Sequence, residues 1–196
     1  MYTQRDIKAV SKHNPLHIEV AIVPWRKISG LKSRLEKAAA LTLAALPEAL
    51  QPAARRAQWT VLLTSDAAVR RLNNDFRGID KPTNVLSFPH FTRPQLVKTN
   101  KGREVVYVGD IAIAYQYVVA EARSEHKILL NHVTHLMIHG LLHLFGYDHQ
   151  ANAPAVRMER LERKRMAELG LPDPYASATS LVPKAKPAHR GQRSKA

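Results

Sequence analysis

The sequence predicts an α+β fold, a two-layer sandwich with one mixed sheet of about four strands and five or so helices. Segments with a two-residue apolar period, typical of half-buried strands, gather before residue 115, whereas helical periodicity dominates the segments after it. The composition supports a sizeable core, because 45% of the 196 residues are hydrophobic and 23% are charged. The chain has no cysteine, which excludes disulfides and thiolate metal sites.

Four segments are expected to form the strands. Residues 17–23 and 59–63 alternate apolar side chains with others, which is the period of a half-buried strand. Residues 83–89 form a short strand whose terminal Pro89 indicates a sheet edge or a strand end. Residues 105–114 are apolar enough for a largely buried strand. The sequence leaves open which of these strands are parallel.

Five segments are expected to form the helices, and the metal-binding one lies in the C-terminal half. The predicted helices cover residues 31–46, a segment that begins after Ser65, and residues 115–124, 128–145 and 154–169. Pro47 stops the first, and Ser65 supplies an N-cap oxygen to the second. Residues 90–104 are mostly polar and are expected to form a mobile loop.

The charge is strongly positive, with 30 Lys and Arg against 16 Asp and Glu, a formal net charge of +14. We expect a basic N-terminal extension over residues 1–16, a folded domain over residues 17–175 and a flexible basic tail over residues 176–196. A polyanionic partner would explain this balance, and solubility alone is the alternative for the tail. No apolar segment approaches the roughly 20 residues that span a bilayer, so no membrane association and a cytoplasmic location are expected.

Three histidines have the spacing of a metal site. His139 and His143 lie four residues apart and therefore on one face of the predicted helix. Gly146 can adopt the left-handed conformation that ends a helix, which would turn the chain so that His149 faces the same ion. Three imidazoles leave the fourth position of a tetrahedral zinc ion open, as in catalytic rather than structural sites.

The neighbouring polar residues have less specific explanations. His135 could support a ligand from one turn away, but core packing or a solvated face is the simpler reading for both His132 and His135. Asp148 could orient a ligating ring or cap the turn. The histidine offsets also occur in metzincin proteases, but Gly140 replaces the glutamate that those enzymes use as a base.

A second polar segment lies upstream, over residues 73–89. Arg77 has a planar donor fork that matches phosphate oxygens, and Lys81 adds a charge close by in the sequence. Asp75 and Asp80 could instead form ion pairs with these two side chains, which would make the cluster structural.

Taken together, residues 73–89, the triplet 109–111 and residues 139–149 resemble the YbeY family of bacterial endoribonucleases, the rRNA maturation factors. The likeness extends from about Ile18 to Tyr175. It implies an α+β sandwich and a single-strand-specific, zinc-dependent endoribonuclease that acts in 16S rRNA 3′-end maturation and ribosome quality control.

The resemblance also implies the site and the partners. The metal ligands of the family fall on His139, His143 and His149, with one Zn²⁺ per chain, and its functional arginine falls on Arg77. The implied partners are single-stranded rRNA, the small ribosomal subunit and its assembly factors. The basic ends and residues 90–104 depart from the compact family core and leave further RNA contacts open.

Two other classes of function stay open at this point. One is a zinc metallopeptidase-like hydrolase, and the other is a noncatalytic ribosome-assembly protein whose ion only fixes the end of the helix. The sequence identifies neither the general base nor the nucleophile, which is either water or a ribose 2′-hydroxyl, and it leaves the oligomeric state unknown.

Overall fold

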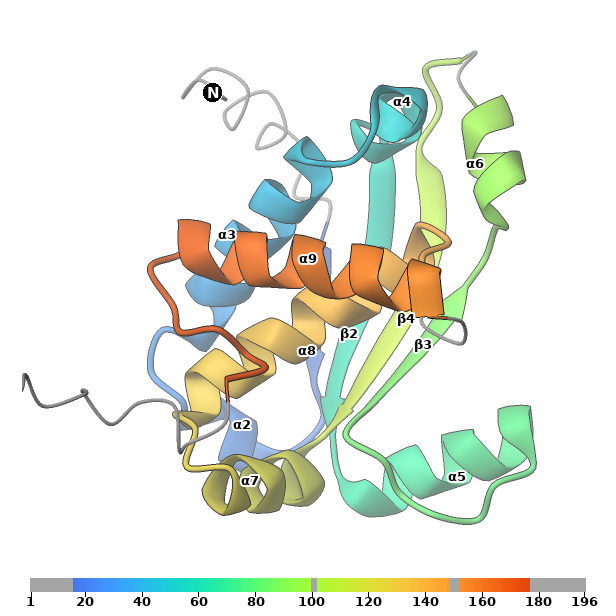
Figure 1. Ribbon diagram of the computed structural model, residues 1–196. Coiled ribbons are helices and arrows are strands. Elements are labelled where there is room, and N and C mark those ends of the chain that lie inside the picture. The colour runs from blue at the N-terminus through green and yellow to red at the C-terminus, as the bar shows by residue number, and fades with distance from the viewer. Residues whose placement is uncertain (1–15, 100–101, 149–151, 177–196) are drawn as a thin grey trace, which may run out of the picture.

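The computed structural model describes residues 16–99, 102–148 and 152–176, and these residues form one mixed sheet with helices packed on it (Figure 1). The strands are β1 (Leu16–Val20), β2 (Ala57–Thr64), β3 (Val85–Pro89) and β4 (Val106–Ala114). Their order is β1-β2-β4-β3, in which β1, β2 and β4 are parallel and β3 runs antiparallel to β4. The predicted α+β class with a mixed four-stranded sheet is confirmed, and β3 lies at an edge, as Pro89 indicated.

The five predicted helices are present, and three short α-helices accompany them in the described residues. The helices are α2 (Val23–Arg26), α3 (Leu31–Ala44), α4 (Gln51–Ala54), α5 (Asp66–Arg77), α6 (Arg93–Lys98), α7 (Tyr115–Ser124), α8 (Leu129–Leu144) and α9 (Asn152–Glu168), with a 3-10 turn at Glu48–Leu50. The additional helices are α2, α4 and α6, which are each one or two turns long.

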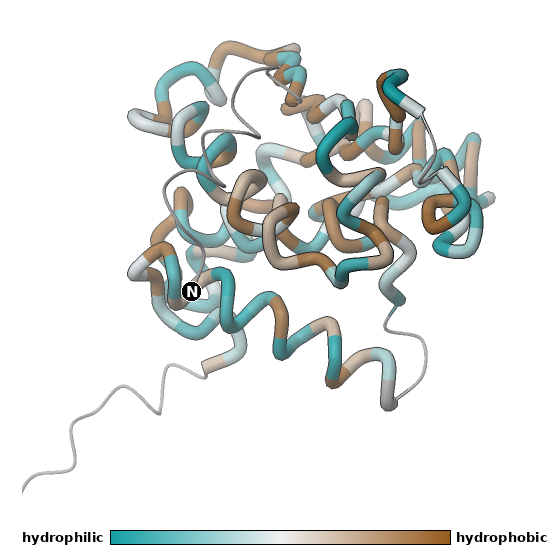
Figure 2. Tube along the Cα trace, turned by 90° about the horizontal axis from the view of Figure 1, so that it is seen from above, coloured by the Kyte–Doolittle hydropathy of each residue, from teal (hydrophilic) through white to brown (hydrophobic). Residues whose placement is uncertain are grey.

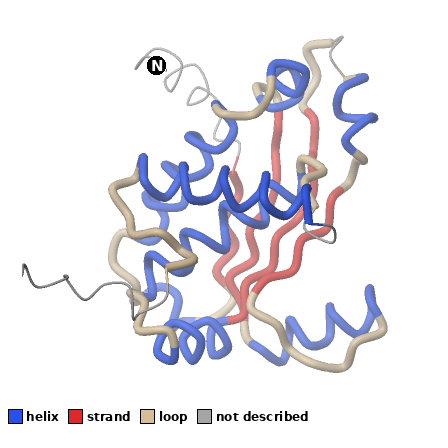
Figure 3. The backbone as a smooth tube through the Cα atoms, in the orientation of Figure 1, coloured by secondary structure: helices blue, strands red, loops and turns tan. Residues whose placement is uncertain are grey.

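Helix α8 is the centre of the main layer. It packs on β3 and β4, while α3 and α9 pack on α8, so that α8 lies between the sheet and two other helices (Figure 3). Most of its residues are buried, including Met137 and Leu141. Hydrophilic and apolar residues alternate along α9 (Figure 2), and Met158 and Met166 on its inner side are buried against this core. The burial of α8 holds its polar side chains in fixed positions.

Helix α5 covers part of the opposite face of the sheet. Val69 of α5 packs with Leu86 and Ala112 in a smaller apolar cluster. The Ser65 hydroxyl accepts a hydrogen bond from the Ala68 backbone N–H, as expected of an N-cap. The helix ends at Gly78, whose φ of 69° is favourable for glycine, and this end places Arg77 beside β3.

Two sequence predictions need correction. The first strand ends at Val20 rather than at residue 23, because Pro24 lies in the first turn of α2, where its missing N–H is no cost. Residues 90–104 are not simply a loop, since they contain α6. Thr92 and Gln95 form a capping box at its start, and the buried Leu96 anchors it in the main core.

The predicted N-terminal extension and C-terminal tail lie, apart from Leu16 and Ala176, outside the described residues. Within the part of the chain that is described, no helix combines the length and the apolar character needed to cross a membrane.

Candidate active site

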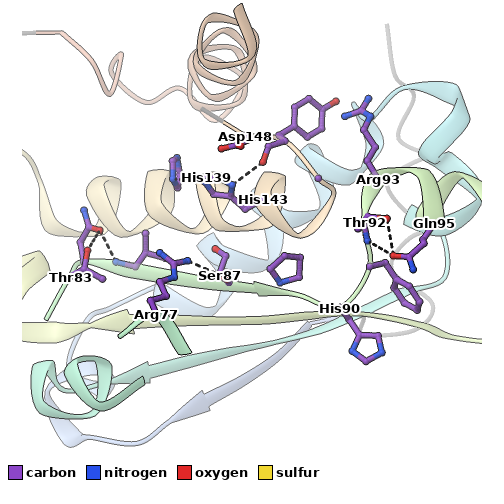
Figure 4. Close-up of a pocket in the computed structure, with 16 residues that line it drawn as sticks. Arg77, Thr83, Ser87, His90, Thr92, Arg93, Gln95, His139, His143 and Asp148 are labelled. Atoms are coloured by element: carbon purple, nitrogen blue, oxygen red, sulfur yellow. Dashed lines mark hydrogen bonds between the residues drawn. The ribbon is translucent and has the colours of Figure 1, made fainter. Parts of the chain in front are cut away.

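A cleft of about 990 Å³ opens between α8, β3 and the start of α6 (Figure 4). Its lining includes two of the predicted metal ligands, His139 and His143, together with the predicted functional residue Arg77. These residues come from α8 and from the end of α5, so the fold brings together segments more than sixty residues apart. The third predicted ligand, His149, lies outside the described residues.

The two imidazoles are held by hydrogen bonds from their Nδ1 atoms. His139 Nδ1 donates to Glu162 Oε1 at 2.9 Å, and His143 Nδ1 donates to the Tyr147 carbonyl, also at 2.9 Å. Carboxylate and carbonyl oxygens only accept hydrogen bonds, so Nδ1 carries the proton in both rings. In the neutral tautomer this leaves the lone pair of each ring on Nε2, the atom that is then able to bind a metal ion.

The Nε2 atoms of His139 and His143 lie 3.1 Å apart, which suits two ligands of one cation. Tetrahedral zinc with Zn–N bonds of about 2.0–2.1 Å places two ligating nitrogens about 3.3 Å apart. Among the described residues, no group of three or more His, Cys, Asp or Glu side chains is arranged to hold a metal. The described part of the cleft therefore presents two nitrogens whose separation fits zinc.

Glu162 of α9 contacts the candidate metal ligand His139 and also His135, and the sequence did not predict these contacts. Its side chain is fully buried, and its carboxylate accepts hydrogen bonds from His139, from His135 Nε2 at 2.8 Å and from the Tyr175 hydroxyl. Burial raises the pKa of the Glu162 carboxyl, but the hydrogen bonds from His135 and His139 outweigh burial and lower it to about 2. Glu162 is therefore ionised at neutral pH and fixes the tautomer of His139 by accepting its Nδ1–H. Carboxylates orient metal-binding histidines in the same way in other proteins.

His143 is positioned by the turn that follows α8. Gly146 has a φ of 73°, and the Tyr147 N–H donates to the Leu142 carbonyl, which is the hydrogen bond of a left-handed helix end. This turn brings the Tyr147 carbonyl back toward His143. Gly146, which the sequence predicted as the end of the helix, therefore also helps to orient the His143 imidazole.

Arg77 lies in the same cleft, exposed, and one of its Nη atoms approaches the Ser87 carbonyl at 3.4 Å. Asp80, which could have paired with it, instead forms a bidentate pair with Arg70, with both distances at 2.6 Å. That hydrogen-bonded pair lowers the pKa of the Asp80 carboxyl. The Arg77 guanidinium is therefore not committed to Asp80.

His132 and His135, the other histidines on α8, are buried. This agrees with core packing, one of the two simpler explanations that the sequence offered for them. His132 Nε2 donates to Glu121 at 2.7 Å, and Asn84 donates to the same carboxylate. His135 touches Glu162 and so supports the carboxylate that orients His139. Asp148 lines the cleft.

Gly140 lies against the sheet. A Cβ atom built at this position would lie 3.0 Å from a side-chain carbon of Ile111 and 3.1 Å from the Ser87 hydroxyl. A glutamate side chain here would have to displace one of these neighbours. The protease base is thus missing from the sequence, and this packing leaves little room for it.

The fold and the cleft together define a class: an α+β protein whose open cleft presents two imidazoles and an arginine, side chains that many enzymes use for catalysis. The model of the family described as Endoribonuclease YbeY matches residues 25–170. The chain belongs to this YbeY family of endoribonucleases.

The chain is similar to two curated proteins that carry this family name. Endoribonuclease YbeY of Nitrobacter hamburgensis is 51% identical over 120 residues, which cover 61% of this chain and 62% of that protein. Endoribonuclease YbeY of Bradyrhizobium diazoefficiens is 42% identical over 171 residues, which cover 86% of this chain and 90% of that protein. A solution structure from Thermotoga maritima aligns with a TM-score of 0.47 at 24% identity, covering 82% of this chain and 99% of that one.

Proposed function

We propose that this protein is a zinc-dependent endoribonuclease specific for single-stranded RNA, which acts in the cytoplasm in 16S rRNA 3′-end maturation and ribosome quality control. The observation that carries the proposal is the pair of Nε2 atoms 3.1 Å apart in an open cleft that also contains Arg77. The family of the chain supports RNA as the substrate. Its partners would be the small ribosomal subunit and associated assembly factors.

His139 and His143, together with His149, would hold the zinc ion through imidazole nitrogens. A zinc ion bound there would supply Lewis acidity toward a phosphoryl oxygen and toward an attacking hydroxyl. Glu162 and the Tyr147 carbonyl keep the protons of His139 and His143 on Nδ1, so that Nε2 faces the cleft.

Arg77 would stabilise the negative charge that develops on the phosphate. The guanidinium is exposed in the cleft and can offer two parallel N–H groups to phosphate oxygens. A peptidase function is not favoured, because Gly140 stands where metzincin proteases have their glutamate base, and side chains of the sheet pack closely against this position.

The test is cleavage of a defined single-stranded RNA by metal-free, zinc-restored, His139→Ala and Arg77→Ala protein, with the product ends mapped. We expect cleavage to require zinc and to be lost in both variants while circular dichroism shows an intact fold. Cleavage that survives either substitution would refute that residue's role. RNA that is bound but never cut would instead support a noncatalytic assembly protein.

A further inference from the structure

The start of helix α6 packs tightly against the turn that follows α8. A Cβ atom at Gly146 would lie 2.6 Å from the Cβ atom of Arg93, the first residue of α6. Contacts this short do not occur between real Cβ atoms, so only glycine permits the observed approach. Arg93 therefore lines the cleft from a helix that packs closely against the end of α8.

The Arg93 side chain lies over an aromatic ring that belongs to the candidate active site. Its guanidinium carbon is 4.6 Å from the centroid of the Tyr147 ring, a cation–π distance. The backbone carbonyl of the same tyrosine accepts the His143 hydrogen bond. One residue thus orients an imidazole with its backbone and an arginine with its ring.

The charge of Arg93 is available to a ligand. Among the residues that the structure describes, no carboxylate forms a salt bridge with it. Arg77 and Arg93 lie on opposite sides of the imidazole pair (Figure 4). An RNA strand that ran through the cleft from Arg77 to Arg93 would pass the Nε2 atoms of His139 and His143.

We propose that Arg93 binds a backbone phosphate of the RNA at a second position, on the side of the imidazoles opposite Arg77, and that the Arg93–Tyr147 pair favours unpaired nucleotides. This inference rests on the proposed endoribonuclease function. The guanidinium fork matches phosphate oxygens, and guanidinium and aromatic planes offer a stacking surface to a base that is not paired. Arg93 is thus a substrate-binding residue rather than a catalytic one.

The test compares Arg93→Gln and Arg93→Lys with the control Lys98→Gln. Lys98 lies on the same helix, is exposed and does not line the cleft, so its loss removes the same charge without the proposed contact. The probe is a short fluorescein-labelled oligouridylate. Steady-state cleavage gives KM and kcat, and anisotropy of the zinc-free protein gives affinity as a function of salt.

For Arg93→Gln we expect a KM raised about 5- to 20-fold with kcat within about twofold of wild type. The slope of log affinity against log salt should become shallower by about 0.7, the value for one phosphate contact to a single strand. Arg93→Lys should retain the wild-type salt slope and lose part of the RNA affinity, because lysine keeps the positive charge but lacks the planar guanidinium group. Lys98→Gln should match wild type throughout.

Three results would overturn the proposal: an unchanged KM and salt slope in Arg93→Gln, a loss of kcat with KM unchanged, or an equal effect in Lys98→Gln. If Arg93→Gln does not fold, Arg93→Lys with wild-type affinity would also contradict it. A wild-type protein that cuts no RNA would refute the proposed function, and the salt slopes would still decide the role of Arg93.

Discussion

Replacing Glu162 with glutamine should weaken zinc binding without removing any predicted ligand. The carboxylate accepts from three donors, His139, His135 and Tyr175, whereas the amide presents an NH₂ group to at least one of them. Loss of such an orienting partner typically weakens metal affinity 10- to 100-fold, or about 1.4–2.8 kcal/mol. The weaker hydrogen bonds from these donors, partly offset by the easier burial of a neutral amide, should also lower the free energy of unfolding by about 2–4 kcal/mol.

The assay is a zinc competition titration of the metal-free protein against a chromophoric chelator, with urea unfolding in chelator as the stability measurement. Glu159→Gln is the matched control, because Glu159 lies on the same helix, is only partly buried and forms a 3.7 Å pair with Arg163 rather than a hydrogen bond with the histidines. That control should keep the zinc affinity and change the free energy of unfolding by less than about 0.5 kcal/mol. A folded Glu162→Gln protein with wild-type zinc affinity would refute the argument that Glu162 sets the imidazole tautomer.

Three further predictions follow from backbone geometry and from one carboxylate. Gly146→Ala should cost at least about 1–2 kcal/mol, since its φ is 73° and the new Cβ would meet the first residue of α6; an unchanged urea midpoint would contradict this. Gly109→Ala places a Cβ 2.1 Å from the Phe88 carbonyl and should disrupt β3–β4 pairing, which soluble yield and circular dichroism would reveal against wild type. The hydrogen bond from His132 lowers the pKa of Glu121 in the folded protein. The ionised Glu121 therefore stabilises the fold at a pH above the ordinary carboxyl pKa, and this stabilisation is lost as the pH falls through the lowered pKa of Glu121. Stability measured over acidic pH should therefore fall less steeply in Glu121→Gln than in wild type, and parallel curves would argue against the assignment.

The part of the site that is local in sequence could be predicted from spacing. His139 and His143 share a helix face because they lie four residues apart, and the structure brings their rings together. Glu162 depends instead on how α9 packs on α8, which no local pattern determines. A signal was present nevertheless, because Met158, Glu162 and Met166 recur every four residues and form a buried stripe on a highly charged helix. A lone carboxylate in such a stripe predicts a buried partner.

The same distinction applies to the fold. Periodicity, apolar content and proline and capping signals together predicted all four strands and the five long helices. The strand order and the placement of α5 on the far face depend instead on contacts between distant segments. The segment that contains α6 was misread because Pro94 and its polar neighbours resemble a loop. Thr92 and Gln95 at a spacing of three formed the capping signature that indicates a helix there.

The position of Glu162 also has a consequence for when the protein acquires its chemistry. Ribosomal synthesis runs from the N-terminus to the C-terminus, so His139 is synthesised 23 residues before Glu162, the carboxylate that orients it. A nascent chain that stops within the first half of α9 carries His139 without the carboxylate that accepts its hydrogen bond. The hydrogen bond that keeps the His139 proton on Nδ1 can therefore form only after most of the chain has been synthesised.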